Sequence, residues 1–209
     1  MARKAGSDGR VTAEAILRES LSLFAQYGFA AVSMRQIADR VGVQPGAIYQ
    51  HHRNKQQLLV AVLDTHMDGL LTASAENQRG DCTSVQALER FARFHIQYHI
   101  TRPDEVFVSY MELRSLEQEG YALIEGKRRK YERALKTILE SGVSDGTFQL
   151  DDPHVSAMAI LSMLTGVNTW FRSGGRLSQQ KIEDIYTSMV LGAVGNRLPE
   201  AHSEGESNV

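Results

Sequence analysis

Two histidines, His95 and His99, have the spacing in this sequence that comes nearest to a metal site. Imidazoles at positions i and i+4 of a helix can bind one zinc ion together. A zinc hydrolase of the HExxH type would carry glutamate after the first histidine, but Ile96 is there, and no third ligand is indicated. We therefore expect no metal and interpret the pair as solvated or pocket-lining.

Patterns typical of other catalytic chemistry are missing from the sequence. It contains no Gly-rich phosphate-binding loop, no GxSxG motif and no carboxylate pair that the sequence sets apart. The single cysteine, Cys82, excludes an internal disulfide and a cysteine-based zinc site. We expect no catalytic residue, no cofactor and no enzymatic activity.

Residues 33–55 contain polar positions of a different kind, on two short helices joined by a tight turn. Ser33 and Gln36 form a capping-box pattern, and apolar residues then recur at helical spacing. Gly42 ends this helix, and Pro45 begins a second one. The second helix is too short to bury much, so its outward residues are free to face a ligand such as a DNA groove.

The charge distribution favours a polyanionic partner for the same end of the chain. Residues 1–55 hold eight Lys and Arg against four acids, a local charge of +4, whereas the whole chain carries −2. The remainder is therefore acidic, at −6. A basic module on an acidic body suits a protein that presents one end to DNA. Random variation in surface charge is the alternative.

Three segments and a following lysine resemble the DNA-binding domain of TetR-family transcriptional regulators, over about residues 11 to 60. The segments are Phe24-Ala25-Gln26-Tyr27-Gly28-Phe29, Met34-Arg35-Gln36-Ile37-Ala38 and Gly46-Ala47-Ile48-Tyr49-Gln50-His51, and the lysine is Lys55. The sequence departs from the usual pattern at His52, where the family has an aromatic or branched apolar residue, and at Gln44, where a serine cap is commoner.

The resemblance implies a division of labour among the DNA-binding candidates. It places Ser33, Tyr49, His51 and Lys55 at phosphates, and Arg35, Ala47 and Gln50 near base edges. Gln44, in the turn, completes the set. Phosphate contacts position such a domain, and base contacts give it specificity.

The rest of the chain is expected to be helical, giving an all-α fold of about nine helices without strands or repeats. Further helices are predicted at about 12–27, 55–78, 84–100, 104–116, 120–140, 152–172 and 178–195. We expect a helix-turn-helix domain (1–55), an effector-binding and dimerisation domain (56–198) and a disordered tail (199–209). Residues 1–10 are predicted to be a flexible arm.

The location in the cell is expected to be cytoplasmic, with no membrane contact. The first ten residues are polar and lack the apolar segment of a secretory signal. The most apolar run, about 157–167, is too short to cross a bilayer.

A homodimer is expected from the helix predicted at 152–172. Ala159, Ser162, Gly166 and Thr169 lie near one face of it, and small residues at this spacing let another helix approach closely. With the final helix they would form a four-helix bundle between two subunits, which the TetR resemblance also implies. The alternative is that both helices are buried within the monomer.

Six residues are the candidates for an effector site that combines apolar walls with a cation: Phe107, Tyr110, Met111, Arg114, Met163 and Trp170. For each aromatic or sulfur-bearing residue, plain core is the alternative. The segment 170–178 is similar to one in TetR-family regulators that sense acyl-CoA thioesters or fatty acids.

Together these patterns predict a ligand-responsive repressor that binds palindromic operator DNA as a homodimer and is released by a small molecule, an acyl-CoA or fatty acid. The rival hypothesis is a helical small-molecule-binding protein or enzyme whose basic end is incidental.

Overall fold

The structure is a computed structural model, which describes residues 7–195. Within that range the chain has nine α-helices, one short 3₁₀ helix and no strand, which confirms the predicted all-α fold. The predicted tail, 199–209, lies outside the described residues, as do residues 1–6 of the predicted arm.

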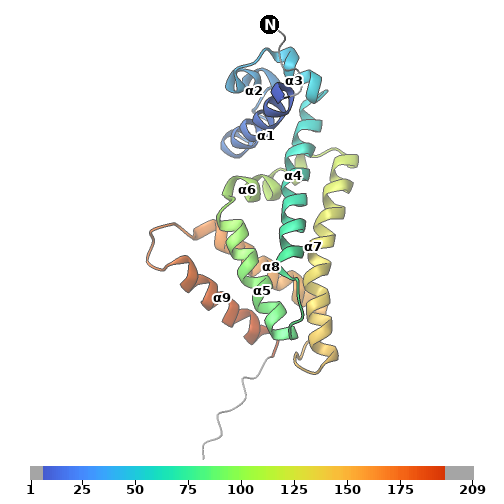
Figure 1. Cartoon of the computed structure of the whole chain (residues 1–209), viewed down its shortest axis with the longest axis vertical. Helices are drawn as coiled ribbons and strands as arrows, with labels where there is room; N and C mark the ends of the chain where they lie inside the picture. Colours follow the sequence, from blue (N-terminus) through green and yellow to red (C-terminus); the bar gives the residue numbers. More distant parts are fainter. Residues whose placement is uncertain (1–6, 196–209) are drawn as a thin grey trace, which may run out of the picture. The chain divides into compact units, whose positions relative to one another are not determined.

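The helices follow one another along the chain in Figure 1. They are α1 (Ser7–Tyr27), α2 (Met34–Val41), α3 (Pro45–His51), α4 (Lys55–Asn77), α5 (Ser84–Ile100), α6 (Pro103–Met111), the 3₁₀ helix η1 (Leu113–Ser115), α7 (Gln118–Ser144), α8 (Pro153–Trp170) and α9 (Gln179–Ala193). The chain divides into two compact units, one made of residues up to 79 with 98–133, the other of 80–97 with residues from 134 onward.

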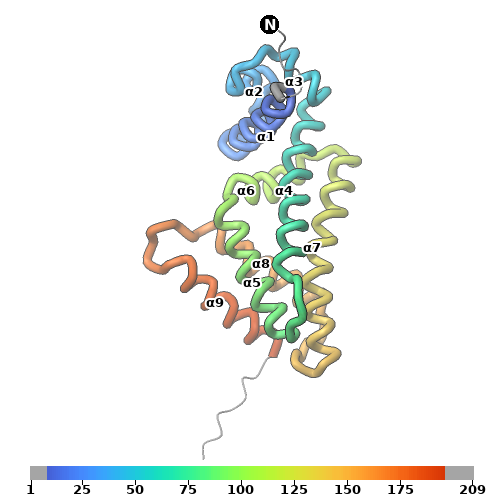
Figure 2. Tube along the Cα trace, viewed as in Figure 1, coloured from blue at the N-terminus to red at the C-terminus, as the bar shows by residue number. Residues whose placement is uncertain are grey.

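The first unit is built around α1, which packs against α2, α4 and α6. Figure 2 shows α1, α2 and α3 gathered at the N-terminal end of α4. Their apolar faces meet in a common core, in which the rings of Phe24 and Phe29 lie edge to face with centroids 5.4 Å apart. Fully buried side chains of this core are Ile16, Phe24, Ile37, Ile48, Leu58, Leu59 and Leu63.

The second unit is held together by an apolar core and one buried carboxylate. Leu88, Phe91, Leu135, Leu164 and Val190 are among its buried apolar side chains. Glu183 of α9 is only 5% exposed. Its carboxylate accepts hydrogen bonds from Gln97 of α5 (2.8 Å) and Gln179 of α9 (2.9 Å), so the buried charge is compensated.

Two predicted helix boundaries are wrong by five residues each, and α7, predicted to end at about 140, continues to Ser144. The first helix begins at Ser7 and not near Thr12, so residues 7–10 belong to α1 and not to a flexible arm. An Arg10–Glu14 ion pair (3.7 Å) at i, i+4 supports this early turn.

The other error is at the end of α6, predicted at Leu116 but observed at Met111. The carboxylate of the next residue, Glu112, accepts hydrogen bonds from the Phe29 amide (3.0 Å) and the Ser115 hydroxyl (2.7 Å). These bonds hold the chain in the 3₁₀ turn of η1. Glu112 contacts a loop 83 residues away, and no local sequence pattern reveals such a contact.

The loop between α1 and α2 is fixed by the first residue of α4. The Lys55 ammonium donates to the carbonyls of Phe29 (2.7 Å), Val32 (2.7 Å) and Ala30 (3.3 Å). It also lies 4.3 Å from the centroid of the Phe29 ring, a cation–π contact. An ammonium has three N–H donors, and all three are used here.

We predict that Lys55→Met lowers the free energy of unfolding by about 1–3 kcal/mol, since it leaves partly buried carbonyls without a donor. Urea unfolding of the two proteins measures the difference. Lys130→Met, an exposed lysine on α7, is the matched control and should change stability by no more than about 0.5 kcal/mol. Equal effects of the two substitutions would refute the anchoring role.

Candidate DNA-binding and effector-binding sites

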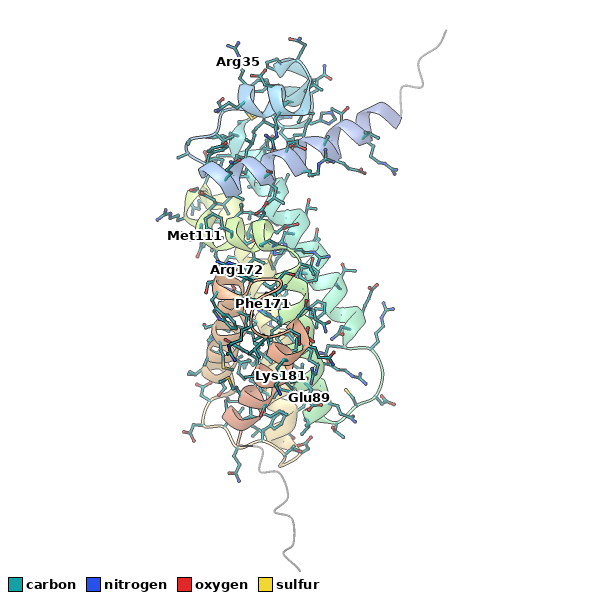
Figure 3. The ribbon with its side chains drawn as sticks, turned by 90° about the vertical axis from the view of Figure 1, so that its left-hand side faces the viewer. Arg35, Glu89, Met111, Phe171, Arg172 and Lys181 are labelled. Carbon is teal, nitrogen blue, oxygen red and sulfur yellow. The ribbon has the colours of Figure 1, made fainter. Side chains whose placement is uncertain are left out.

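The N-terminus of α2 is held by the predicted capping box. The Gln36 amide donates to the Ser33 hydroxyl (3.3 Å), and the Gln36 side chain accepts from the Ser33 amide (2.8 Å). Met34, Ile37 and Ala38 are the buried residues of α2. The opposite face, including Arg35, is therefore exposed, and Figure 3 shows the Arg35 side chain projecting away from the helices.

The turn between α2 and α3 depends on Gly42, whose φ of +79° lies in the left-handed region. Its amide donates to the carbonyls of Ala38 (2.9 Å) and Asp39 (3.3 Å), which closes the end of α2. Gln44 precedes Pro45 as the N-cap of α3, but its side chain makes no capping hydrogen bond and is exposed. That side chain is thus available to a ligand.

Helix α3 buries a single residue, Ile48. Tyr49 is 51% exposed, Gln50 and His51 are exposed, and Ala47 is half-buried. One buried anchor with a polar exterior is what a recognition helix requires, because the helix stays docked while its outward side chains can enter a groove.

Half of the six Lys and Arg side chains in residues 9–55 form an ion pair with a carboxylate. Arg18 and Arg40 both contact the carboxylate of Glu19 at 3.1 Å. Hydrogen bonding to Arg40 lowers the pKa of Glu19, so this carboxylate stays ionised. In the part of the chain from residue 9 to 195, Arg35 and Arg53 form no ion pair.

Arg53 did not enter the predicted set, although its charge and its place directly after α3 were visible in the sequence. It is exposed in the connection between α3 and α4. The turn there is closed by a hydrogen bond from the Arg53 amide to the Gln57 side chain (3.0 Å) and one from the Gln57 amide to Asn54 (2.8 Å).

His52 and Lys55 are both partly buried. His52, at the departure from the family pattern, is half-buried, and burial lowers the pKa of its imidazole. Its ring therefore tends to be neutral. Lys55 has its ammonium on the three loop carbonyls described above, so a direct phosphate bond would compete with one of them.

The predicted effector residues fall into two groups. Phe107, Tyr110 and Met111 of α6 are each close to half-exposed, at 47%, 47% and 46%, which is unlike plain core. The Arg128 guanidinium of α7 lies 4.9 Å from the Tyr110 ring centroid, and Arg114 is exposed in η1.

The other two candidates, Met163 and Trp170, lie on α8 in the second unit. Met163 is half-buried, whereas Trp170 is 49% exposed and stacks on Tyr186 of α9, with ring centroids 6.3 Å apart. Close by, Arg172, labelled in Figure 3, donates to the carbonyl of Phe171 (2.7 Å) at the end of α8.

Of the two interpretations of the histidine pair, solvated or pocket-lining, the first is wrong because both side chains are buried. His95 is 1% and His99 4% exposed, and the His95 ring hydrogen-bonds the Thr165 hydroxyl at 3.0 Å. No group of three or more His, Cys, Asp or Glu side chains among the described residues could hold a metal ion.

Comparison with known proteins identifies the chain. The family model described as "Bacterial regulatory proteins, tetR family" matches residues 16–62, and the one described as "Tetracyclin repressor-like, C-terminal domain" matches residues 81–194, more than half of the chain. A similar curated protein is the HTH-type transcriptional repressor KstR2 of Mycolicibacterium smegmatis, 26% identical over 90% of this chain and 93% of that protein.

Solved structures agree with the family models. A regulatory protein of the tetR family from Rhodococcus RHA1 has a TM-score of 0.84 and 28% identity, over 90% of this chain and 98% of its own. AibR, solved with isovaleryl coenzyme A and operator DNA, has a TM-score of 0.79 and 27% identity, over 89% of this chain and 100% of its own. The chain belongs to the tetR family of bacterial regulatory proteins, as a DNA-binding transcriptional regulator and not an enzyme.

Proposed function

We propose that the protein is a repressor, that it binds palindromic operator DNA as a homodimer through α2 and α3, and that an amphipathic acyl-CoA or fatty acid releases it. The observation that carries the DNA proposal is the polar exterior of α3, docked by Ile48 alone beside the unpaired Arg35. The contacts are proposed for Ser33, Arg35, Gln44, Ala47, Tyr49, Gln50 and His51, with Arg53 added and Lys55 acting through its charge.

The cytoplasmic location stays part of this proposal. Among the described helices, α4 alone is long and apolar enough to cross a membrane by length and composition. Eight of its side chains are buried, including Leu58, Leu63 and Leu70, and the core helix of a soluble protein has the same character.

The dimer interface is proposed on the outer face of α8 with α9. Ala159, Ser162 and Thr169 are exposed, and the hydroxyls of the last two bond back to their own helix, to the carbonyls of Met158 and Gly166 (2.8 Å each). The face thereby presents few unsatisfied donors. On α9, Met189 is 54% exposed, so apolar surface is also available.

The effector proposal rests on α6. Three half-exposed apolar side chains in nine residues are costly to leave in water, and an acyl chain covering them would gain about 0.8 kcal/mol for each buried CH₂. Arg114 and Arg128 supply cations for an anionic head. AibR, similar over almost its whole length, was solved with an acyl-CoA, which supports this ligand class.

We expect Arg35→Ala and Gln50→Ala each to cost about 1–3 kcal/mol in operator binding and to relax base preference at particular positions. Arg53→Ala should weaken binding to all sequences alike and reduce the salt slope by about one unit. Selection of bound sites from random DNA, followed by binding titrations at several salt concentrations, measures both. Arg129→Ala, an exposed arginine on α7, is the control. A uniform loss with Arg35→Ala would reassign that residue to a phosphate.

Gly166→Leu should abolish the dimer without unfolding the monomer. A Cβ built at Gly166 meets nothing within 4 Å inside the chain, so the larger side chain is tolerated there and clashes only with a partner helix. Sedimentation at micromolar concentration should show monomer with undiminished helicity. Gly126→Leu, where a Cβ also meets nothing within 4 Å, should remain dimeric. A dimeric Gly166→Leu would place the interface elsewhere.

Acyl-CoAs or fatty acids should release the protein from its operator and raise its melting temperature, whereas Phe107→Ala and Met111→Ala should each raise the concentration needed for half-release about tenfold. Leu123→Ala removes a similarly exposed side chain on α7 and serves as the control. The test is to titrate acyl-CoAs, fatty acids and planar aromatic cations against the DNA complex and to measure the fraction of protein released. Release by the cations alone would instead indicate a drug sensor.

A further inference from the structure

A groove lies in the first unit, between α1, α4, the C-terminal end of α5 and the start of α6. It has a volume of about 350 Å³. That volume is at the lower end of the range for ligand sites. Leu17, Leu21 and Val62 form its apolar side, and His66, Tyr98 and Arg102 are among its polar lining residues. None of the proposed effector residues belongs to this lining.

His66 is the feature of the groove that the rest of the protein leaves unexplained. Its side chain is 7% exposed, and its buried Nδ1 atom has no hydrogen-bond partner. An unsatisfied buried polar atom costs about 1–3 kcal/mol, so such atoms are uncommon without a ligand or another function. The ring lies near those of Tyr98 and His99, with centroids 6.1 and 6.5 Å away.

Arg102 supplies a positioned cation at the same place. Its guanidinium carbon lies 3.9 Å from the Tyr98 ring centroid. One of its nitrogens donates to the Thr101 hydroxyl (2.8 Å) and the Tyr98 carbonyl (3.3 Å). A guanidinium stacked on a ring and tied at one nitrogen loses little freedom when it binds an anion with its remaining donors.

The electrostatic surroundings favour an anion over a cation. Burial, followed by the charges of His99, Arg102 and Arg128, lowers the pKa of His66 to about 4, so the ring is neutral at pH 7. Burial is the largest cause of this shift, and the smaller part that comes from Arg102 and Arg128 reflects a positive potential, which attracts a carboxylate. The nearby charged and titratable groups are Glu14 and Arg18 of α1, already paired with Arg10 and Glu19, Glu105 of α6, Arg102, His99 of α5 and Arg128 of α7.

We propose that this groove binds a small carboxylate with a short aliphatic or aromatic body. The carboxylate lies at the Arg102 guanidinium and accepts a hydrogen bond from His66, and the body covers Leu17, Leu21 and Val62. Because Leu17 and Leu21 belong to α1 and Val62 to α4, the ligand touches both the helix behind the helix-turn-helix and the helix that leaves it.

The test uses the full-length protein with octanoate and benzoate, and with octanamide and benzamide as neutral counterparts. Calorimetry gives the affinity, and NMR of the histidine ring protons reports the site. We expect the carboxylates to shift the His66 resonances, to raise the pH at which that ring titrates, and to bind at least tenfold more tightly than the amides. Equal binding of acids and amides, or unchanged His66 resonances at millimolar carboxylate, would overturn the proposal.

Variants locate the site. Arg102→Gln should weaken carboxylate binding at least tenfold, whereas Arg129→Gln, with the same change of charge on the exposed face of α7, should not. If Arg102→Gln does not fold, Leu21→Trp, which fills the groove from α1, replaces it and should abolish binding. Carboxylate binding that survives these changes but is lost in Phe107→Ala would assign the ligand to the effector site and refute this one.

Discussion

The structure of the DNA-binding end depends on one partly buried ion–dipole contact, the Lys55 ammonium on the carbonyls of Phe29, Ala30 and Val32. These residues connect α1 to α2, and Lys55 begins α4, so a single side chain ties three helices together. Burial lowers the pKa of Lys55 while the charge of Glu112 opposes that shift. Lys55 thus stabilises the loop between α1 and α2, and it also brings a positive charge close to the recognition surface.

Glu112 binds the same loop through a backbone amide. The amide of Phe29 donates to Glu112 while its carbonyl accepts from Lys55, so the two successive peptide groups on either side of Phe29 are each bound by a distant side chain. Since Glu112 directly follows α6, the helix with the half-exposed effector candidates ends on the loop that leads into α2. A ligand on α6 can influence DNA binding through this contact only if it binds two arrangements of the loop with different affinities.

Most features whose causes are local could be predicted from the sequence, the start of α1 being an exception, and features with distant causes could not. The Ser33 and Asn54 caps and the Gly42 turn use partners within four residues, and the helices they bound were predicted closely. The end of α6 depends on a partner 83 residues away. The carbonyl contacts of Lys55 and the burial of His66 also depend on distant residues and were not predicted. For the effector candidates, the sequence indicated the kinds of side chain that a ligand needs, but not which of them are exposed.

The charge of the DNA-binding end is less available than its composition suggests. Arg18 and Arg40 share Glu19, Arg10 pairs with Glu14, and Lys55 spends its donors on carbonyls, while Arg3 and Lys4 lie outside the described residues. Arg35 and Arg53 remain for direct contact, Arg35 at a base edge and Arg53 at about one phosphate per subunit. At a slope of about −0.9 per phosphate, the two Arg53 side chains of a dimer would contribute a slope near −2. Such moderate electrostatic attraction means that hydrogen bonds from α3 and simultaneous binding of two half-sites must supply much of the affinity.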